Sequence, residues 1–128
     1  MLTALAALVS SGLLAALWNV LGWAPRTLAG YELTQSLAPA TWGFAAAYAV
    51  IAGLLGWITR RPWPVALGMI LIRPIACSVE IAQDPTSHNL IPFEILMFWL
   101  PLLLLAFACA SVGRVFRARA DMVRASER

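Results

Sequence analysis

Four long apolar runs dominate the chain, and polar or turn residues separate them. The runs cover residues 2–23, 41–59, 64–82 and 90–113. A helix needs about 20 apolar residues to cross the ~30 Å hydrocarbon core of a bilayer, and each run has about that length. Because lipid offers no hydrogen-bond partners to the backbone, such a run crosses as a helix. The pattern therefore predicts an all-α membrane protein, an up-down bundle of four transmembrane helices.

Composition supports this prediction. The chain has 128 residues, of which 62% are hydrophobic and 12% charged, and its mean hydropathy is +0.82. A soluble domain is about half apolar and about a quarter charged, and one of this size has too little interior to hide the excess. The net charge of +3 comes from nine arginines against six acids, and all of these arginines except Arg73 lie outside the runs or at their ends, which argues against a nucleic-acid-binding face. We expect the lipid bilayer as partner, and no nucleic acid.

A cleavable signal peptide is the alternative explanation of the first run. The run lacks the basic segment that opens a signal peptide, it exceeds the usual apolar length of 7 to 15 residues, and no small-residue cleavage site follows it. We therefore expect it to stay in the protein as a span.

The positions of the arginines predict the orientation. Seven lie in the link 60–61 and in the tail 114–128, whereas the first link holds only Arg26 and the third link holds none. Basic residues stay on the cytoplasmic side, so the tail and, with four spans, the N-terminus are both expected there. All basic residues are Arg and none is Lys, which together with much Ala and Leu indicates a GC-rich bacterial genome. We expect a multi-pass protein of the bacterial inner membrane.

The second run carries small residues at helical spacing. Two such series overlap, Ala45, Ala49 and Gly53 in one and Ala52 and Gly56 in the other. Small residues four apart let two helix backbones approach closely in a membrane. The partner is either another helix of the same bundle or a second copy of the chain, so a homo-oligomer or a larger membrane complex stays open.

Ionisable residues gather in the last two runs, where lipid makes them costly. Four residues in and after the third run share one helical face at i, i+4, i+7 and i+11, namely Arg73, Cys77, Glu80 and Asp84. Glu80 lies ~6 Å from the outer end of its span and Glu94 ~7 Å from the outer end of the next, at 1.5 Å per residue. The two glutamates are therefore expected at similar depth on neighbouring helices.

A short turn joins these two spans and carries further polar groups. Asp84-Pro85 is a turn signal. Asn19 is expected in the outer half of the first span. Pro74 removes a backbone donor beside Arg73 and is expected to kink the third helix. The predicted ligand-binding or ion-binding pocket opens outward and is formed by Asn19, Arg73, Glu80, Asp84, His88 and Glu94.

Three interpretations of this cluster stay open. Arg73 can pair with Glu80 or Glu94 and only hold the helices in register. Alternatively, three carboxylates against one Arg leave an acid free to bind a proton, a metal or a cationic ligand. Carboxylate and imidazole groups suit Zn, Fe or Mn, and the candidate metal ligands are Glu80, Asp84, His88 and Glu94.

The sequence thus predicts a small membrane protein whose pocket binds or relays a small ligand, ion or proton, alone or in a larger complex. A structural or accessory subunit and a metal-dependent membrane enzyme are the alternatives. We expect no enzyme, because no nucleophile with its base, P-loop or dinucleotide fingerprint is present. The sequence points to no particular cofactor.

The orientation is testable with two modified chains. A reporter fused after Arg128 is expected in the cytoplasm, and a Thr86→Cys variant is expected to react with a membrane-impermeant maleimide added from outside. Labelling of position 86 only from the cytoplasmic side would contradict the predicted orientation.

Overall fold

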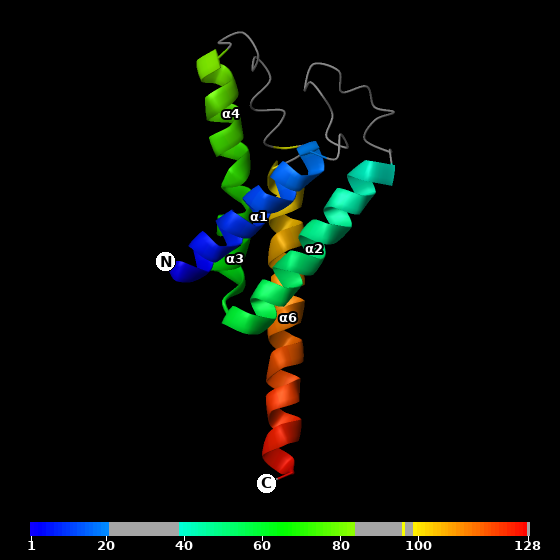
Figure 1. The fold of residues 1–128 in the computed structure, drawn as a ribbon. Coiled ribbons are helices and arrows are strands. Elements are labelled where there is room, and N and C mark those ends of the chain that lie inside the picture. Colours follow the sequence, from blue (N-terminus) through cyan, green and yellow to red (C-terminus); the bar gives the residue numbers. More distant parts are fainter. Residues whose placement is uncertain (21–38, 84–95, 97–98, 128) are drawn as a thin grey trace.

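Helices are the only regular secondary structure among the residues that the structure describes, which are residues 1–20, 39–83, 96 and 99–127 of a computed structural model (Figure 1). The described helices are α1 (Leu2–Val20), α2 (Pro39–Thr59), α3 (Pro62–Ile70), α4 (Ile72–Gln83) and α6 (Leu100–Ser126). The predicted all-α class is confirmed for this part of the chain.

The third apolar run forms α3 and α4, which join end to end at Leu71. Hydrogen bonds continue through the junction, since the Leu71 N–H donates to the Leu67 carbonyl and the Ile75 N–H to the Leu71 carbonyl, each at 3.2 Å. Pro74 has no N–H to donate to the carbonyl of Ile70, and its ring crowds that carbonyl. The interruption at Leu71 lies within one turn of Pro74, where a kink was expected.

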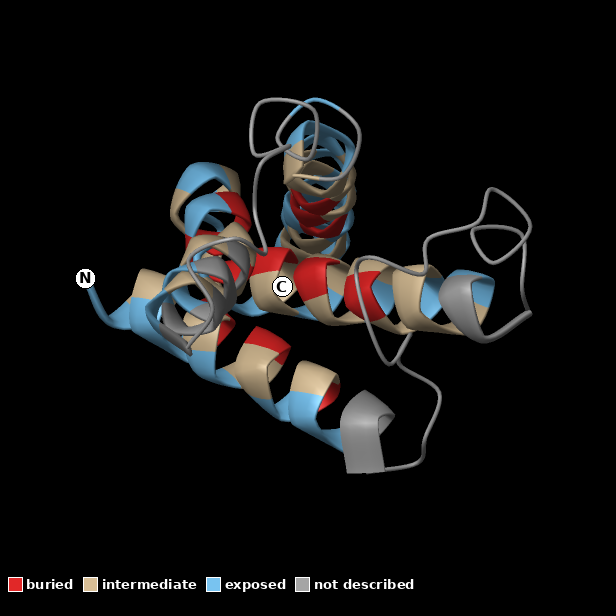
Figure 2. Cartoon of the chain, turned by 90° about the horizontal axis from the view of Figure 1, so that it is seen from above, coloured by how far each residue is buried: buried red, intermediate tan, exposed pale blue. Residues whose placement is uncertain are grey.

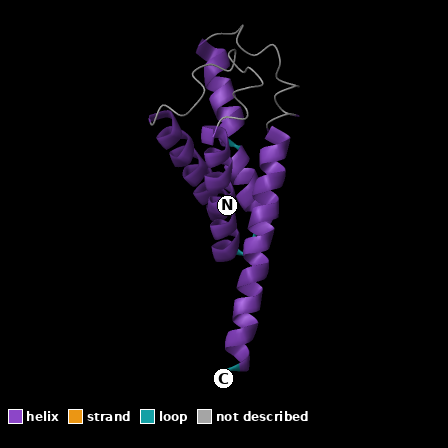
Figure 3. Ribbon diagram, turned by 90° about the vertical axis from the view of Figure 1, so that its right-hand side faces the viewer, coloured by secondary structure: helices purple, strands orange, loops and turns teal. Residues whose placement is uncertain are grey.

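Two of the described helices are long and apolar enough to cross a membrane. These segments are Trp42–Thr59, with a mean hydropathy of 1.5, and Leu100–Ser126, with 1.6. A shorter apolar helix covers Leu2–Leu17. Helix α6 has 27 residues and is therefore ~40 Å long. It continues through the tail, so residues 114–126 prolong the last helix past the α2–α3 turn (Figures 1 and 3).

Helices α2 and α6 run parallel to each other, and their backbones nearly touch. A Cβ placed on Gly56 would overlap the carbonyl oxygen and Cα of Ala110, and one placed on Gly113 would overlap the carbonyl oxygen of Gly53. Ala52 is fully buried in the same interface. The small residues of the second run therefore pack against another helix of the same chain, which is the first of the two alternatives considered above.

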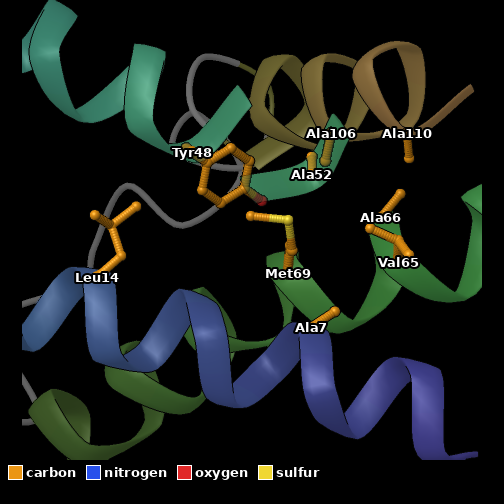
Figure 4. Packing of buried hydrophobic residues seen from close by; sticks show 9 residues of the cluster. All are labelled: Ala7, Leu14, Tyr48, Ala52, Val65, Ala66, Met69, Ala106 and Ala110. Carbon is orange, nitrogen blue, oxygen red and sulfur yellow. The ribbon is translucent and has the colours of Figure 1, made fainter. Parts of the chain in front are cut away.

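Helices α1 and α3 form a second parallel pair. A Cβ on Gly68 would overlap the carbonyl oxygen of Ala4 and press on the methyl group of Ala7. Larger side chains fill the space between the two pairs, with Tyr48 of α2 and Met69 of α3 at its centre (Figure 4). The buried hydrophobic core comprises Ala7, Leu14, Tyr48, Ala52, Val65, Ala66, Met69, Ala106 and Ala110.

Large apolar side chains lie on the outside of every helix. They recur about every fourth residue along α1, α2 and the α3–α4 pair and at Leu100, Leu104 and Val112 of α6, so they form outward ridges, and the buried residues face inward (Figure 2). The ridges comprise Leu5, Val9, Leu13 and Leu17 on α1, Val50, Leu54 and Ile58 on α2, Trp63, Leu67, Leu71 and Ile75 along α3 and α4, and Leu100, Leu104 and Val112 on α6. Soluble monomers rarely expose apolar surface so continuously.

The close approach of α2 and α6 is testable with two glycines three residues apart. Gly56→Ala is expected to lower the thermal stability of the detergent-purified protein, by about 1–3 kcal/mol, because the new methyl group meets backbone that cannot move aside. Gly53→Ala is the matched control. Its methyl group would find its nearest neighbour, the Cys109 carbonyl oxygen, at 3.7 Å. Helix propensity then makes this change neutral or stabilising by up to about 1 kcal/mol. Equal melting of the two variants would refute the contact.

Candidate functional site

The structure describes none of the six side chains of the predicted pocket. Asn19 lies near the end of α1, and Arg73 and Glu80 lie on α4, but the side chains of these three are outside the described residues. Asp84, His88 and Glu94 lie outside them altogether. The pocket therefore stays a prediction. The structure does describe the backbone of α4, the helix that carries Arg73 and Glu80.

The exposed side chains that the structure describes on α4 share one face. The side chains of Ile75, Ser78 and Ala82 are exposed, and they follow one another at i, i+3 and i+7. Ser78 is satisfied locally, since its hydroxyl donates to the Pro74 carbonyl at 2.7 Å. At 100° per residue, positions 73, 77 and 80 lie on the opposite side of the helix axis. The three exposed side chains that the structure describes on α4 are therefore not on the side of positions 73, 77 and 80.

The question of a metal centre is untested. Within the described residues no three His, Cys, Asp or Glu side chains come together as a metal site would require. The predicted ligands are not among the groups compared, because Glu80 lacks a described side chain and Asp84, His88 and Glu94 lie outside.

A second polar cluster, which the sequence did not predict, lies at the α2–α3 turn. The carboxylate of Asp121 on α6 binds two arginines at once. Arg60 Nη2 lies 2.7 Å from its Oδ2, and Arg117 Nε lies 3.4 Å from its Oδ1. The guanidinium of Arg117 also lies 5.9 Å from the ring centroid of Trp57, within cation–π range. The cluster joins the end of α2 to the extension of α6.

The backbone at Arg60 is strained. Its φ of 58° lies in the left-handed region, where residues other than Gly and Asn are unusual. The conformation ends α2, because the Arg60 N–H donates to the Gly56 carbonyl at 2.9 Å in the position where a helix usually has glycine. Left-handed backbone costs about 1–2 kcal/mol for an L-residue. An arginine in this place suggests that its side chain is needed there.

Arginines outnumber the single acid of this cluster. Arg61 follows Arg60 directly, and Arg114 follows Gly113, whose backbone abuts Trp57; both side chains are exposed. In the sequence these arginines predicted the orientation, and Asp121 was not recognised as their partner. The i, i+4 spacing of Arg117 and Asp121 was visible in the sequence. The pairing of Arg60 with Asp121, 61 residues apart, was not.

Comparisons with protein families, with curated proteins and with solved structures found no match to this chain. Function is therefore inferred from the chain's own residues.

The strain at Arg60 predicts a difference between two truncations. Arg60→Gly and Arg60→Ala both remove the ion pair, but only glycine adopts the left-handed backbone freely. The glycine variant is expected to be about 1 kcal/mol more stable than the alanine variant in thermal or denaturant unfolding. Equal stabilities, or a more stable alanine variant, would show that the left-handed cap is not formed.

Proposed function

We propose that this protein is an integral membrane protein with four spans and both termini in the cytoplasm of a bacterial cell, and that a polar pocket at its outer end binds or relays a small ligand, ion or proton. The membrane placement is supported by the outward ridges of Leu, Val and Ile on every helix. Removing these side chains from water would stabilise the bundle in lipid by about 25 cal/mol per Å².

The orientation is supported by the position of the arginines in space. Arg60 and Arg61 at the α2–α3 turn lie at the same end of the molecule as Arg114 and Arg117 on α6, because the Arg60–Asp121 pair joins the two segments. A bundle with this end in the cytoplasm agrees with the preference of basic residues for that side. Trp57 and Trp63 flank the turn, at the level where amphipathic aromatic rings meet headgroups.

The two faces of α4 are the observation that carries the pocket. With Ile75, Ser78 and Ala82 exposed, positions 73 and 80 are on the other side of the helix axis, and we propose that this side faces the bundle interior. Charged residues inside membrane proteins face the bundle interior or a water-filled cavity. Glu80 and Glu94, expected at similar depth, would then supply carboxylates to one cavity, with Asn19, Asp84 and His88 near its mouth and Arg73 deeper.

Apolar and aromatic contacts hold the described helices together. No charged side chain among the described residues is buried, and the buried hydroxyls include that of Ser11, which donates to the Leu8 carbonyl at 3.0 Å, and that of Tyr48. Helices α3 and α6 are held in register by Trp63 and Phe107, whose ring centroids lie 4.4 Å apart. We assign Arg73 and Glu80, whose side chains lie outside the described residues, to the pocket rather than to this packing.

The proposal is tested by separate Glu80→Gln and Glu94→Gln substitutions in protein reconstituted into liposomes. Infrared difference spectra between pH 8 and pH 5, and with and without Mn²⁺, are expected to show a carboxyl band that responds to protons or to the metal. Each substitution is expected to remove or strongly reduce that response. Glu127→Gln, at an exposed position near the end of the chain, is the matched control and should leave the response unchanged.

Circular dichroism and thermal melting of the same samples separate the alternatives. The proposed pocket predicts folded variants that have lost the response. Variants that fail to fold would instead support an accessory subunit whose charges hold helices together. A response to Mn²⁺ together with hydrolysis of added model esters or amides, both lost in Glu80→Gln, would support a metal-dependent enzyme.

A further inference from the structure

The cluster at the α2–α3 turn carries excess positive charge on one small surface. It contains Arg60, Arg61, Arg114 and Arg117, and Asp121 is its one acid, so four positive charges meet one negative charge and three remain. No described carboxylate forms an ion pair with Arg61 or Arg114, and both side chains are exposed. These five residues are called the turn cluster below.

Asp121 organises the turn cluster. Each of its two oxygens forms an ion pair with a different arginine, Arg60 from the end of α2 and Arg117 from α6. The shared carboxylate holds the two guanidiniums close together despite their like charge. Residues 114, 117 and 121 follow one another at i, i+3 and i+7, so Arg114 lies on the same face of α6. Preorganised arginines lose less freedom when they bind an anion, and a guanidinium forms paired hydrogen bonds to phosphate.

An exposed aromatic side chain lies beside the same charges. Trp63, at the start of α3 and two residues after Arg61, is 56% exposed and packs on Phe107. Phe107 precedes Arg114 by seven residues, so the two share one face of α6. A site that combines arginines with an exposed tryptophan on this face offers both a place for an anionic headgroup and an apolar surface for the acyl chains attached to it.

We infer that the turn cluster is a binding site for one anionic phospholipid of the cytoplasmic leaflet, with its phosphate at Arg61 and Arg114 and its acyl chains along Trp63. Basic pockets between membrane helices on the cytoplasmic side commonly bind such headgroups. This inference rests on the membrane placement proposed above but not on the outer pocket, which lies at the other end of the molecule. It gives the strained backbone of Arg60 a role, because that backbone directs the arginine to Asp121.

Native mass spectrometry of the full-length protein in detergent tests the inference. The protein is titrated with phosphatidylglycerol and, separately, with phosphatidylcholine, whose headgroup has the same phosphate but no net charge. Phosphatidylglycerol is expected to bind more tightly at one site. An Arg61→Gln/Arg114→Gln double variant is expected to lose about 30-fold in that affinity, from about 5-fold per arginine at a membrane surface.

An Arg119→Gln/Arg124→Gln double variant is the matched control. It removes the same charge from exposed positions of α6 outside the turn cluster, and its affinity is expected to stay within about threefold of that of the original chain. Equal losses in the two double variants would overturn the inference in favour of general attraction to charge. Equal binding of both lipids by the original chain would overturn it as well.

Failure of the membrane placement is distinguishable from failure of the lipid site. A chain that stays in the soluble fraction of cells and binds neither lipid would contradict the placement and the site together. A chain that needs detergent for extraction and binds both lipids equally would contradict the site alone.

Discussion

The contact between the backbones of α2 and α6 is the constraint on which the rest of the structure depends. Gly56 abuts Ala110, and Gly113 abuts Gly53, so no side chain separates the two helices at these points. In lipid, apolar surface gains nothing by leaving its surroundings, and helices associate through close van der Waals contact instead. A glycine or alanine at each crossing point is therefore what allows the pair to form. The α1–α3 pair packs in the same way, with Gly68 against the backbone of Ala4.

Two features follow from these contacts. Many large apolar side chains find no room at these crossings and point outward as ridges, whereas, among the described residues, Tyr48, Met69 and further aliphatic and aromatic residues fill the gap between the two pairs. Parallel packing of α2 and α6 also fixes which residues meet at the end of the bundle. Because residue 57 lies beside residue 113, the continuation of α6 passes the α2–α3 turn and brings Asp121 to Arg60.

The sequence predicted features that depend on neighbours along the chain. Run lengths predicted the helices, Pro74 the interruption near Leu71, and the series ending at Gly53 and Gly56 a close helix crossing. It could not predict which helix Gly56 would meet, since residues 56 and 110 come together only through the tertiary packing. The pairing of Arg60 with Asp121 was hidden for the same reason. The outer pocket depends on Asp84, His88 and Glu94, outside the described residues, and stays a prediction from spacing.

Nitroxide scanning in liposomes tests most directly the claim that each helix packs one face on its neighbours and turns the other face to lipid. Two pairs of adjacent leucines offer matched sites, Leu54 with Leu55 on α2 and Leu104 with Leu105 on α6, in which the first is exposed and the second packs on the core. Each is changed to Cys and spin-labelled in a chain carrying Cys77→Ala and Cys109→Ala. The account predicts that molecular oxygen, which dissolves in lipid, relaxes the labels at 54 and 104 much faster than those at 55 and 105, and that a water-soluble nickel chelate reaches none of them. Strong relaxation by the nickel chelate at 54 and 104 would contradict it.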